Sequence, residues 1–177
     1  MKILSMKMYN LFFAVFLTLP AFAQTDLASK IGHSEVVEVA GASAKTLTIR
    51  ATSFMESKKI ETRTIGNTVS GIGALSVAYT SVKKGPETGN VKFALKITIK
   101  DGKYKIDLTD FKHEGIQGKS SGGSVDLEKA ECGESHITKG SWAMIKTETS
   151  AKMKVFVQEL KIKMDYPAKV APVNTDF

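Results

Sequence analysis

The clearest alternation of apolar and polar side chains in this chain lies between residues 91 and 100. The apolar members stand at every second position: Val91, Phe93, Leu95, Ile97 and Ile99. A period of two residues predicts a strand with one buried face and one solvated face. Residues 104–108 repeat the alternation and predict a second strand of the same kind.

These two strands are joined by the dipeptide Asp101-Gly102, which favours a two-residue hairpin with a type I′ turn and positive φ at both positions. The turn places Ile99 opposite Tyr104 on one face. On the other face it pairs Lys96 with Asp107, two opposite charges. Because one register satisfies both faces, we predict an antiparallel hairpin that is buried on one side only.

Three further strands are predicted from short alternating or β-branched segments. They cover residues 35–39, 60–65 and 69–80. The last of them contains Gly71 and Gly73. We expect these glycines to allow a bend or a bulge in the strand, because no third glycine or helix follows to form a dinucleotide-binding turn.

Two amphipathic helices are predicted at the two ends of this strand-rich region. The first covers residues 44–58, with Ser43 as its N-cap and Lys58 at its end. The second covers residues 141–163. Its apolar stripe is formed by Trp142, Ile145, Thr149, Met153, Phe156 and Leu160.

The periodicity is lost after Phe111 and returns near residue 139. We therefore predict a long loop over 112–139, in which residues 125–130 have the composition for one or two helical turns. The element order is β-α-β-β-β-β-α. Two apolar helical faces and one apolar sheet face predict a two-layer α+β fold, with about five antiparallel strands and both helices on one face.

The first 23 residues have the three regions of a secretory signal peptide. Lys2 and Lys7 precede an apolar run over residues 11–19, and Ala21-Phe22-Ala23 supplies the small-x-small pattern before a predicted cleavage site. The apolar run is shorter than the roughly 20 residues of a permanent membrane span. We expect an exported protein, periplasmic, secreted or on the cell surface, with no membrane span after cleavage.

Cleavage leaves 177 minus 23 residues, enough for one domain with its own core. We expect a lead-in at 24–33, one domain at 34–166 and an extended tail at 167–177. The formal charge of +7 falls to +5 when both N-terminal lysines are removed. This mildly basic balance favours acidic partners without selecting one, and export argues against nucleic acid.

Cys132 is the only cysteine, so no internal disulfide can form. The thiol is buried, free or paired with a second chain, and the sequence leaves all three open. We expect a monomer or a weak dimer.

Two segments carry a family resemblance. Glu35-Val-Val-Glu-Val-Ala-Gly41 leads into a helix, and Ile97-Thr-Ile-Lys-Asp-Gly-Lys-Tyr-Lys-Ile-Asp-Leu-Thr-Asp-Phe111 follows later. Together they resemble a family of exported Gram-negative bacterial proteins known as a domain of unknown function with a TATA-binding-protein-like fold. The resemblance covers residues 34–111. It implies a curved antiparallel sheet with two helices on its convex side, and it supplies no catalytic residues.

The sharpest chemical cluster in the sequence is His113, Cys132 and His136, all within the predicted loop. Cysteine and histidine can ligate zinc or act as nucleophile and base. A single Cys-x-x-x-His falls short of a zinc motif, which needs three or four ligands. Gly118-Lys119-Ser120 resembles the end of a phosphate-binding loop, but His113 stands where the first glycine is required.

The solvated face of the predicted sheet carries four lysines and several small side chains. The lysines are Lys92, Lys96, Lys100 and Lys105, and the small residues are Ser70, Ala74, Ser76 and Ala78. This face could hold a ligand or a peptide in a shallow concavity. We predict a non-enzymatic binding or structural module of the bacterial envelope with no cofactor, whose partner is an envelope protein, a peptide or a small ligand. The alternative is an envelope hydrolase or metal-binding protein that uses Cys132 and His136.

Overall fold

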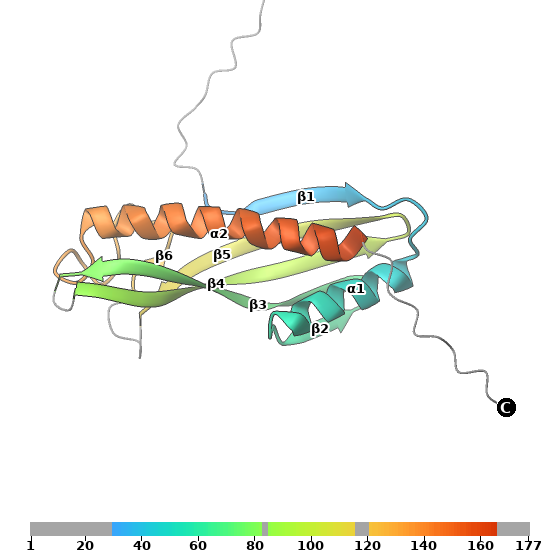
Figure 1. Cartoon of the computed structure of the whole chain (residues 1–177), viewed down its shortest axis with the longest axis horizontal. Helices are drawn as coiled ribbons and strands as arrows, with labels where there is room; N and C mark the ends of the chain where they lie inside the picture. Colours follow the sequence, from blue (N-terminus) through green and yellow to red (C-terminus); the bar gives the residue numbers. More distant parts are fainter. Residues whose placement is uncertain (1–29, 83–84, 116–120, 166–177) are drawn as a thin grey trace, which may run out of the picture.

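Two helices lie on one face of a curved, open antiparallel sheet (Figure 1). The structure is a computed structural model, and it describes residues 30–82, 85–115 and 121–165. The predicted signal peptide at 1–23 and the predicted tail at 167–177 lie outside the described residues. None of the helices within the described part of the chain combines the length and the apolar character needed to cross a bilayer.

The predicted two-layer α+β architecture is confirmed, with one short strand more than expected. The elements are β1 (His33–Glu38), α1 (Ala44–Ser57), β2 (Thr62–Ile65), β3 (Thr68–Ser81), β4 (Gly85–Lys100), β5 (Lys103–Glu114), β6 (Gly123–Ser124) and α2 (Lys139–Asp165). The sheet order is β1-β5-β4-β3-β2, and β6 pairs with β5. All strand pairings are antiparallel.

The β4–β5 hairpin has the predicted register. Ile99 lies opposite Tyr104, and Lys96 lies opposite Asp107. The predicted type I′ turn is wrong, because Gly102 has a φ of 71° while its neighbour in the turn, Asp101, has no positive φ.

Contacts with the chain before α1 explain this turn. The Asp101 carboxylate accepts the Ala44 N–H at 2.7 Å, and the Gly102 N–H donates to the Ala42 carbonyl at 2.8 Å. Ser43 caps α1 as predicted, because its Oγ accepts the Thr46 N–H at 3.2 Å. The hairpin turn and the start of α1 therefore hold each other in place.

A β-bulge in β5 changes which side chains face the core. Between Lys92 and Ala94 of β4 the register shifts, because β5 has one extra residue there, Asp110, with a φ of 58°. Before the bulge the even-numbered residues of β5 are buried, whereas after it Phe111 and His113 point inward. The alternation that ends at Phe111 in the sequence therefore continues in the structure with its parity reversed.

The segment predicted as a loop over 112–139 is partly regular. β5 continues to Glu114, β6 pairs with β5, and α2 begins at Lys139. Residues 125–130 form turns and bends rather than a helical turn. Thr138 Oγ1 accepts the Ser141 N–H at 3.1 Å, which caps α2 before the predicted start of that helix.

The core lies between the sheet and the two helices. Four rings meet at its centre: Phe54 and Phe93 each lie edge-on to Phe156 at 5.2 Å, and Phe93 stacks with Phe111 at 5.4 Å. Arg50 of α1 is buried, and its Nη1 donates to the Met164 carbonyl at 2.6 Å. This bond ties α1 to the negative end of α2.

Gly71 and Gly73 do not form the bulge that the sequence analysis considered. The β3–β4 ladder continues through both residues without a shift. Their role is to leave space, since a Cβ at Gly73 would lie 2.3 Å from Cζ of Phe93. The missing side chain lets the Phe93 ring occupy the core surface of β3.

Candidate functional site

One face of the sheet is covered by α1 and α2, and the described part of the chain leaves the other face uncovered (Figure 1). Side chains alternate between the two faces along each strand, so the register identifies those on the uncovered side. We call this side the open sheet face. Its charged members are Glu38, Arg63, Lys92, Lys96, Lys100, Lys103, Lys105, Asp107, Lys112 and Glu114.

The open sheet face is positively charged. Its seven basic and three acidic side chains leave a net charge of +4. Lys92 pairs with Glu114 at 2.8 Å, and Lys105 pairs with Asp107 at 2.7 Å. Among the described residues, no carboxylate lies within 4 Å of Lys96, so this ammonium group is available to a partner.

Asp107 is a carboxylate that lies among the lysines of the open sheet face, opposite Lys96 and paired with Lys105. Partial burial raises its pKa, but hydrogen bonds from Lys105 and from Ser34 Oγ, the latter at 2.7 Å, outweigh this effect, so the net pKa is lowered. Lys96 lowers the pKa further through its charge. The carboxylate is therefore ionised and holds the Lys105 ammonium group beside it.

The other half of the open sheet face is uncharged and made of small side chains. Ala74, Ser76 and Ala78 of β3 are exposed, and Ala74 lies opposite Lys92 at the border with the basic half. Ile72 keeps 62 % of its surface exposed and lies opposite Ala94. A shallow, partly apolar surface therefore adjoins the lysines.

The structure places three basic residues on this face that the sequence analysis did not single out. Lys103 could have been found, because the hairpin register puts it opposite Lys100. Lys112 was missed because the bulge reverses the alternation before it. Arg63 carried no signal, because the pairing of β2 with β3 was not predicted from the pattern.

His113 is a core residue with only 1 % of its surface exposed. Its Nδ1 accepts the Gly122 N–H at 3.0 Å, so Nε2 carries the proton of the neutral ring. Nε2 is buried, and the described residues supply no hydrogen-bond partner for it. Burial lowers the pKa of His113 despite the opposing charge of Glu114.

Two aromatic rings enclose His113. Tyr79 and Trp142 lie edge-on to it, with ring centroids 5.1 and 6.0 Å away. Glycines supply the space, because a Cβ at Gly89 would lie 2.5 Å from the His113 Nε2, and one at Gly122 would lie 2.2 Å from the Trp142 ring. The sequence analysis did not connect these residues, which come from five separate segments.

Cys132 and His136 lie near each other but not as a nucleophile and its base. His136 Nδ1 is 3.1 Å from the backbone oxygen of Cys132 and 3.1 Å from Ser135 Oγ. Burial raises the pKa of the half-buried Cys132 thiol, which keeps it protonated near neutral pH. No hydrogen bond or ring contact joins either residue to His113.

The described residues offer no metal centre. No group of three or more histidine, cysteine, aspartate or glutamate side chains comes close enough to hold an ion within the part of the chain that the structure describes. Gly118-Lys119-Ser120 lies outside the described residues. Among the described residues, the structure therefore brings no set of side chains together that would support the hydrolase or the metal-binding alternative.

Tyr79, which packs against His113, has a raised pKa. Burial first, and then the hydrogen bond from its hydroxyl to Glu87 at 2.9 Å, raise the pKa of Tyr79 to about 12. A phenol with a raised pKa remains protonated at neutral pH and acts as a donor rather than a base.

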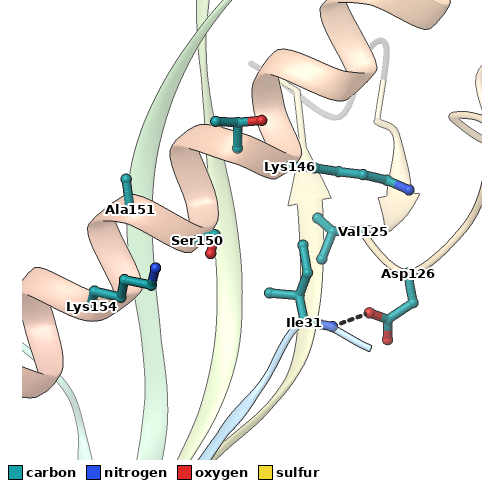
Figure 2. A pocket seen from close by; sticks show the side chains of 8 residues that line it. Ile31, Val125, Asp126, Lys146, Ser150, Ala151 and Lys154 are labelled. Atoms are coloured by element: carbon teal, nitrogen blue, oxygen red, sulfur yellow. Dashed lines mark hydrogen bonds between the residues drawn. The ribbon is translucent and has the colours of Figure 1, made fainter. Parts of the chain in front are cut away.

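A groove of about 760 Å³ lies on the helix side of the molecule, away from the open sheet face. It runs between α2 and the turn after β6 (Figure 2). Ile31 and Val125 form its apolar floor, and Lys146 and Lys154 extend from α2 at its border. The Ile31 N–H donates to Asp126 Oδ1 at 2.7 Å, which fastens the start of β1 to this turn. Among its polar lining residues, Thr147 and Lys154 are exposed, and Asp126, Lys146 and Ser150 are half-buried.

No protein-family model matches this sequence, and no curated protein matches it. Solved structures with a similar fold include two bacterial proteins. One is a TBP-like protein from Parabacteroides distasonis, with a TM-score of 0.57, 14 % identity, and coverage of 78 % of this chain and 94 % of that chain. The other is a DUF4468 family protein from Bacteroides ovatus, with a TM-score of 0.54, 16 % identity, and coverage of 80 % and 90 %. The fold is therefore TBP-like.

Proposed function

We propose that this protein is a non-enzymatic binding module, exported to the envelope of a Gram-negative bacterium, that holds an acidic partner on its open sheet face. The observation that supports the proposal is the uncompensated positive charge of this face. Lysines from β4 and β5 project from a rigid sheet, and among the described residues only Lys92 and Lys105 are paired with carboxylates. We expect the partner to be an acidic segment of an envelope protein or an acidic peptide.

The fold supports a binding role for this surface. The helices and the aromatic core fix the sheet from behind, so the lysines on its front are held at the spacing of adjacent strands. Charges at fixed positions on a rigid surface give specificity and fast association. The uncharged strip from Ile72 to Ala78 can contact less polar parts of the same partner.

The test uses fluorescein-labelled oligo-glutamate as an acidic probe and measures its anisotropy with the mature protein. Lys96→Glu should weaken binding by about tenfold, because it removes an unpaired cation and adds a repulsive charge. Added salt should weaken wild-type binding in the same assay, since exposed charges are screened within about 8–10 Å.

Lys154→Glu on α2 is the matched control, because it makes the same charge change on the opposite side of the molecule. Equal losses with Lys96→Glu and Lys154→Glu would show that only the overall charge matters, and would overturn the assignment of this face. Undiminished binding with Lys96→Glu would have the same consequence.

A further inference from the structure

Among the described residues, no strand pairs with the long strand β3 from Ile72 to Thr80 on the side that faces β2. β2 pairs only with residues from Thr68 to Gly71. Beyond them, the one bridge that the described chain makes on this edge joins Ser81 to Ile137. Figure 1 shows β2 lying beside only one end of β3. A free sheet edge presents backbone N–H and C=O groups that another strand can bind.

Side chains of α2 cover the far part of this edge. Glu148 Oε2 accepts the Ala78 N–H at 2.9 Å, and the Lys152 ammonium donates to the Ser76 carbonyl. Ser141 Oγ donates to the Thr80 carbonyl at 2.7 Å. These contacts occupy backbone groups that would otherwise bind a strand.

Ala74 is the position that these side chains do not reach. In an antiparallel ladder, every second residue directs its backbone groups away from the paired strand. Ser76, Ala78 and Thr80 do so, and Ala74 has the same parity. Among the described residues, none donates to or accepts from the outward N–H and C=O of Ala74.

A cavity of about 310 Å³ lies beside this uncovered position. Its apolar wall is formed by Ile60, Leu75, Val155 and Phe156. The charges at its border are already paired: Lys58 with Glu159 at 2.6 Å, and Lys152 with Glu148 at 2.8 Å. The cavity therefore suits an uncharged, apolar group.

We infer that the Ala74 edge of β3 binds an extended segment of a partner protein by strand addition, with one apolar side chain of that segment in the adjacent cavity. The backbone of Ala74 supplies the hydrogen bonds, and the cavity selects the side chain. This site uses the backbone edge of β3 and a cavity on the helix side of that strand, whereas the open sheet face uses side chains on the other side, and it takes a neutral segment rather than an acidic one.

The occupant is a single extended segment rather than the same edge of a second copy. Twofold pairing about Ala74 would set Ile72 of one copy against Ser76 of the other, where the Lys152 ammonium binds. Two such contacts would have to break. A short segment can bond to Ala74 and leave Lys152 in place.

The probe is the neutral peptide acetyl-Ser-Thr-Leu-Thr-Ser-amide, titrated into isotopically labelled mature protein and followed by amide NMR. We expect saturable shifts at Ala74, Leu75 and Val155, with a dissociation constant in about the millimolar range. Methylating the leucine nitrogen of the peptide should weaken binding about two- to tenfold if that N–H donates to Ala74, since one backbone hydrogen bond is worth that factor.

Ala74→Pro removes the outward N–H without removing a bond to β4, and should weaken binding by a similar factor. Ala74→Ser keeps the N–H and should bind like the wild type. Val155→Trp should block the cavity, whereas Ile162→Trp, at another exposed apolar position of α2, should not. The comparison of Val155→Trp with Ile162→Trp tests the site even if Ala74→Pro does not fold.

The proposal is overturned if no saturable shifts occur, or if Val155→Trp and Ile162→Trp bind the peptide equally. It is also overturned if the protein dimerises in light scattering without peptide and Ala74→Pro is monomeric, because the occupant is then a second copy. None of these outcomes depends on oligo-glutamate binding. The test of this site and the test of the open sheet face are therefore independent of each other.

Discussion

Gly73 of β3 lies directly opposite Phe93 of β4, and the aromatic ring covers the glycine on the core side of the sheet. A Cβ at Gly73 would lie 2.3 Å from Cζ of Phe93, closer than any real contact. The same ring is buried and packs against Phe111 and Phe156. The small residue and the large one therefore form one packing unit.

The first prediction concerns this unit. Gly73→Ala should lower the free energy of unfolding by about 1–3 kcal/mol, because the added methyl group overpacks the core. Urea denaturation measures the loss. In the double variant Gly73→Ala with Phe93→Leu, the cost of the alanine should shrink, because the ring is no longer there.

Gly140→Ala in the first turn of α2 is the control for this experiment. A Cβ there meets no atom closer than 3.9 Å, so alanine should be neutral or stabilising. An equal loss from both substitutions would contradict the packing explanation. Additive losses from Gly73→Ala and Phe93→Leu would contradict it as well.

The sequence predicted the parts of the fold that depend on an unbroken period. The β4–β5 hairpin is one of them, because the pairs Ile99–Tyr104 and Lys96–Asp107 follow from counting outward from the turn. The prediction from the sequence failed where one extra residue interrupts the alternation of buried and exposed positions. Asp110 adds a residue to β5, so Phe111 begins a buried set of opposite parity that resembles a loop in the sequence.

The candidate site was predictable to a similar degree. Lys92, Lys96, Lys100 and Lys105 share a face because their strands alternate regularly. His113 could not be placed, since its burial depends on the bulge and on glycines from distant segments. The sequence analysis grouped His113 with Cys132 because both lie in the predicted loop. In the structure, His113 packs against Tyr79 and Trp142 instead.

The second prediction concerns the bulge. Asp110 has a φ of 58°, a conformation that aspartate tolerates and a β-branched residue does not. Asp110→Val should destabilise the protein by about 1–3 kcal/mol, and Asp110→Gly should be neutral or stabilising. Thermal denaturation of the two variants compares them directly. A loss in the glycine variant as large as in the valine variant would mean that the carboxylate matters more than the backbone conformation.

The third prediction concerns the protected edge of β3. Glu148 is held ionised: partial burial raises its pKa, but the bonds from Lys152 and from the Ala78 N–H lower it by more. Glu148→Ala should cost about 1 kcal/mol in the free energy of unfolding and increase self-association, because it uncovers the edge. Urea denaturation and light scattering measure the two effects.

Glu148→Gln is the matched variant for this residue. Its amide oxygen keeps an acceptor for the Ala78 N–H, so the edge should remain covered and self-association should stay at the wild-type level. If the glutamine and alanine variants associate equally, the negative charge rather than the hydrogen bond protects the edge.

The fourth prediction concerns pH. His113 is neutral in the folded protein, and burial holds its pKa below the usual value of about 6.5. As the pH falls below that value, the unfolded chain binds a proton that the folded protein does not. Stability should therefore be full above about pH 6.5 and should decrease as the pH falls toward the lowered pKa of the folded state.

Protonation would also disrupt the local structure. Nδ1 accepts the Gly122 N–H, so adding a proton there would set two donors against each other. The turn that carries Gly122 packs on Trp142, and the Trp142 Nε1 donates to the Leu127 carbonyl at 3.0 Å. We expect the segment from 121 to 127 to show the first loss of amide protection on acidification, in hydrogen-exchange measurements.

His113→Asn isolates this contribution. The asparagine oxygen can still accept the Gly122 N–H, but it does not titrate, and the smaller side chain lowers stability by a pH-independent amount. The difference in unfolding free energy between wild type and variant should therefore shrink as the pH is lowered from about 7 to 5. A difference that stays constant over this range would show that His113 does not couple folding to pH. An NMR titration of the imidazole checks the cause independently, because a ring that protonates at or above its usual pKa could not produce the effect.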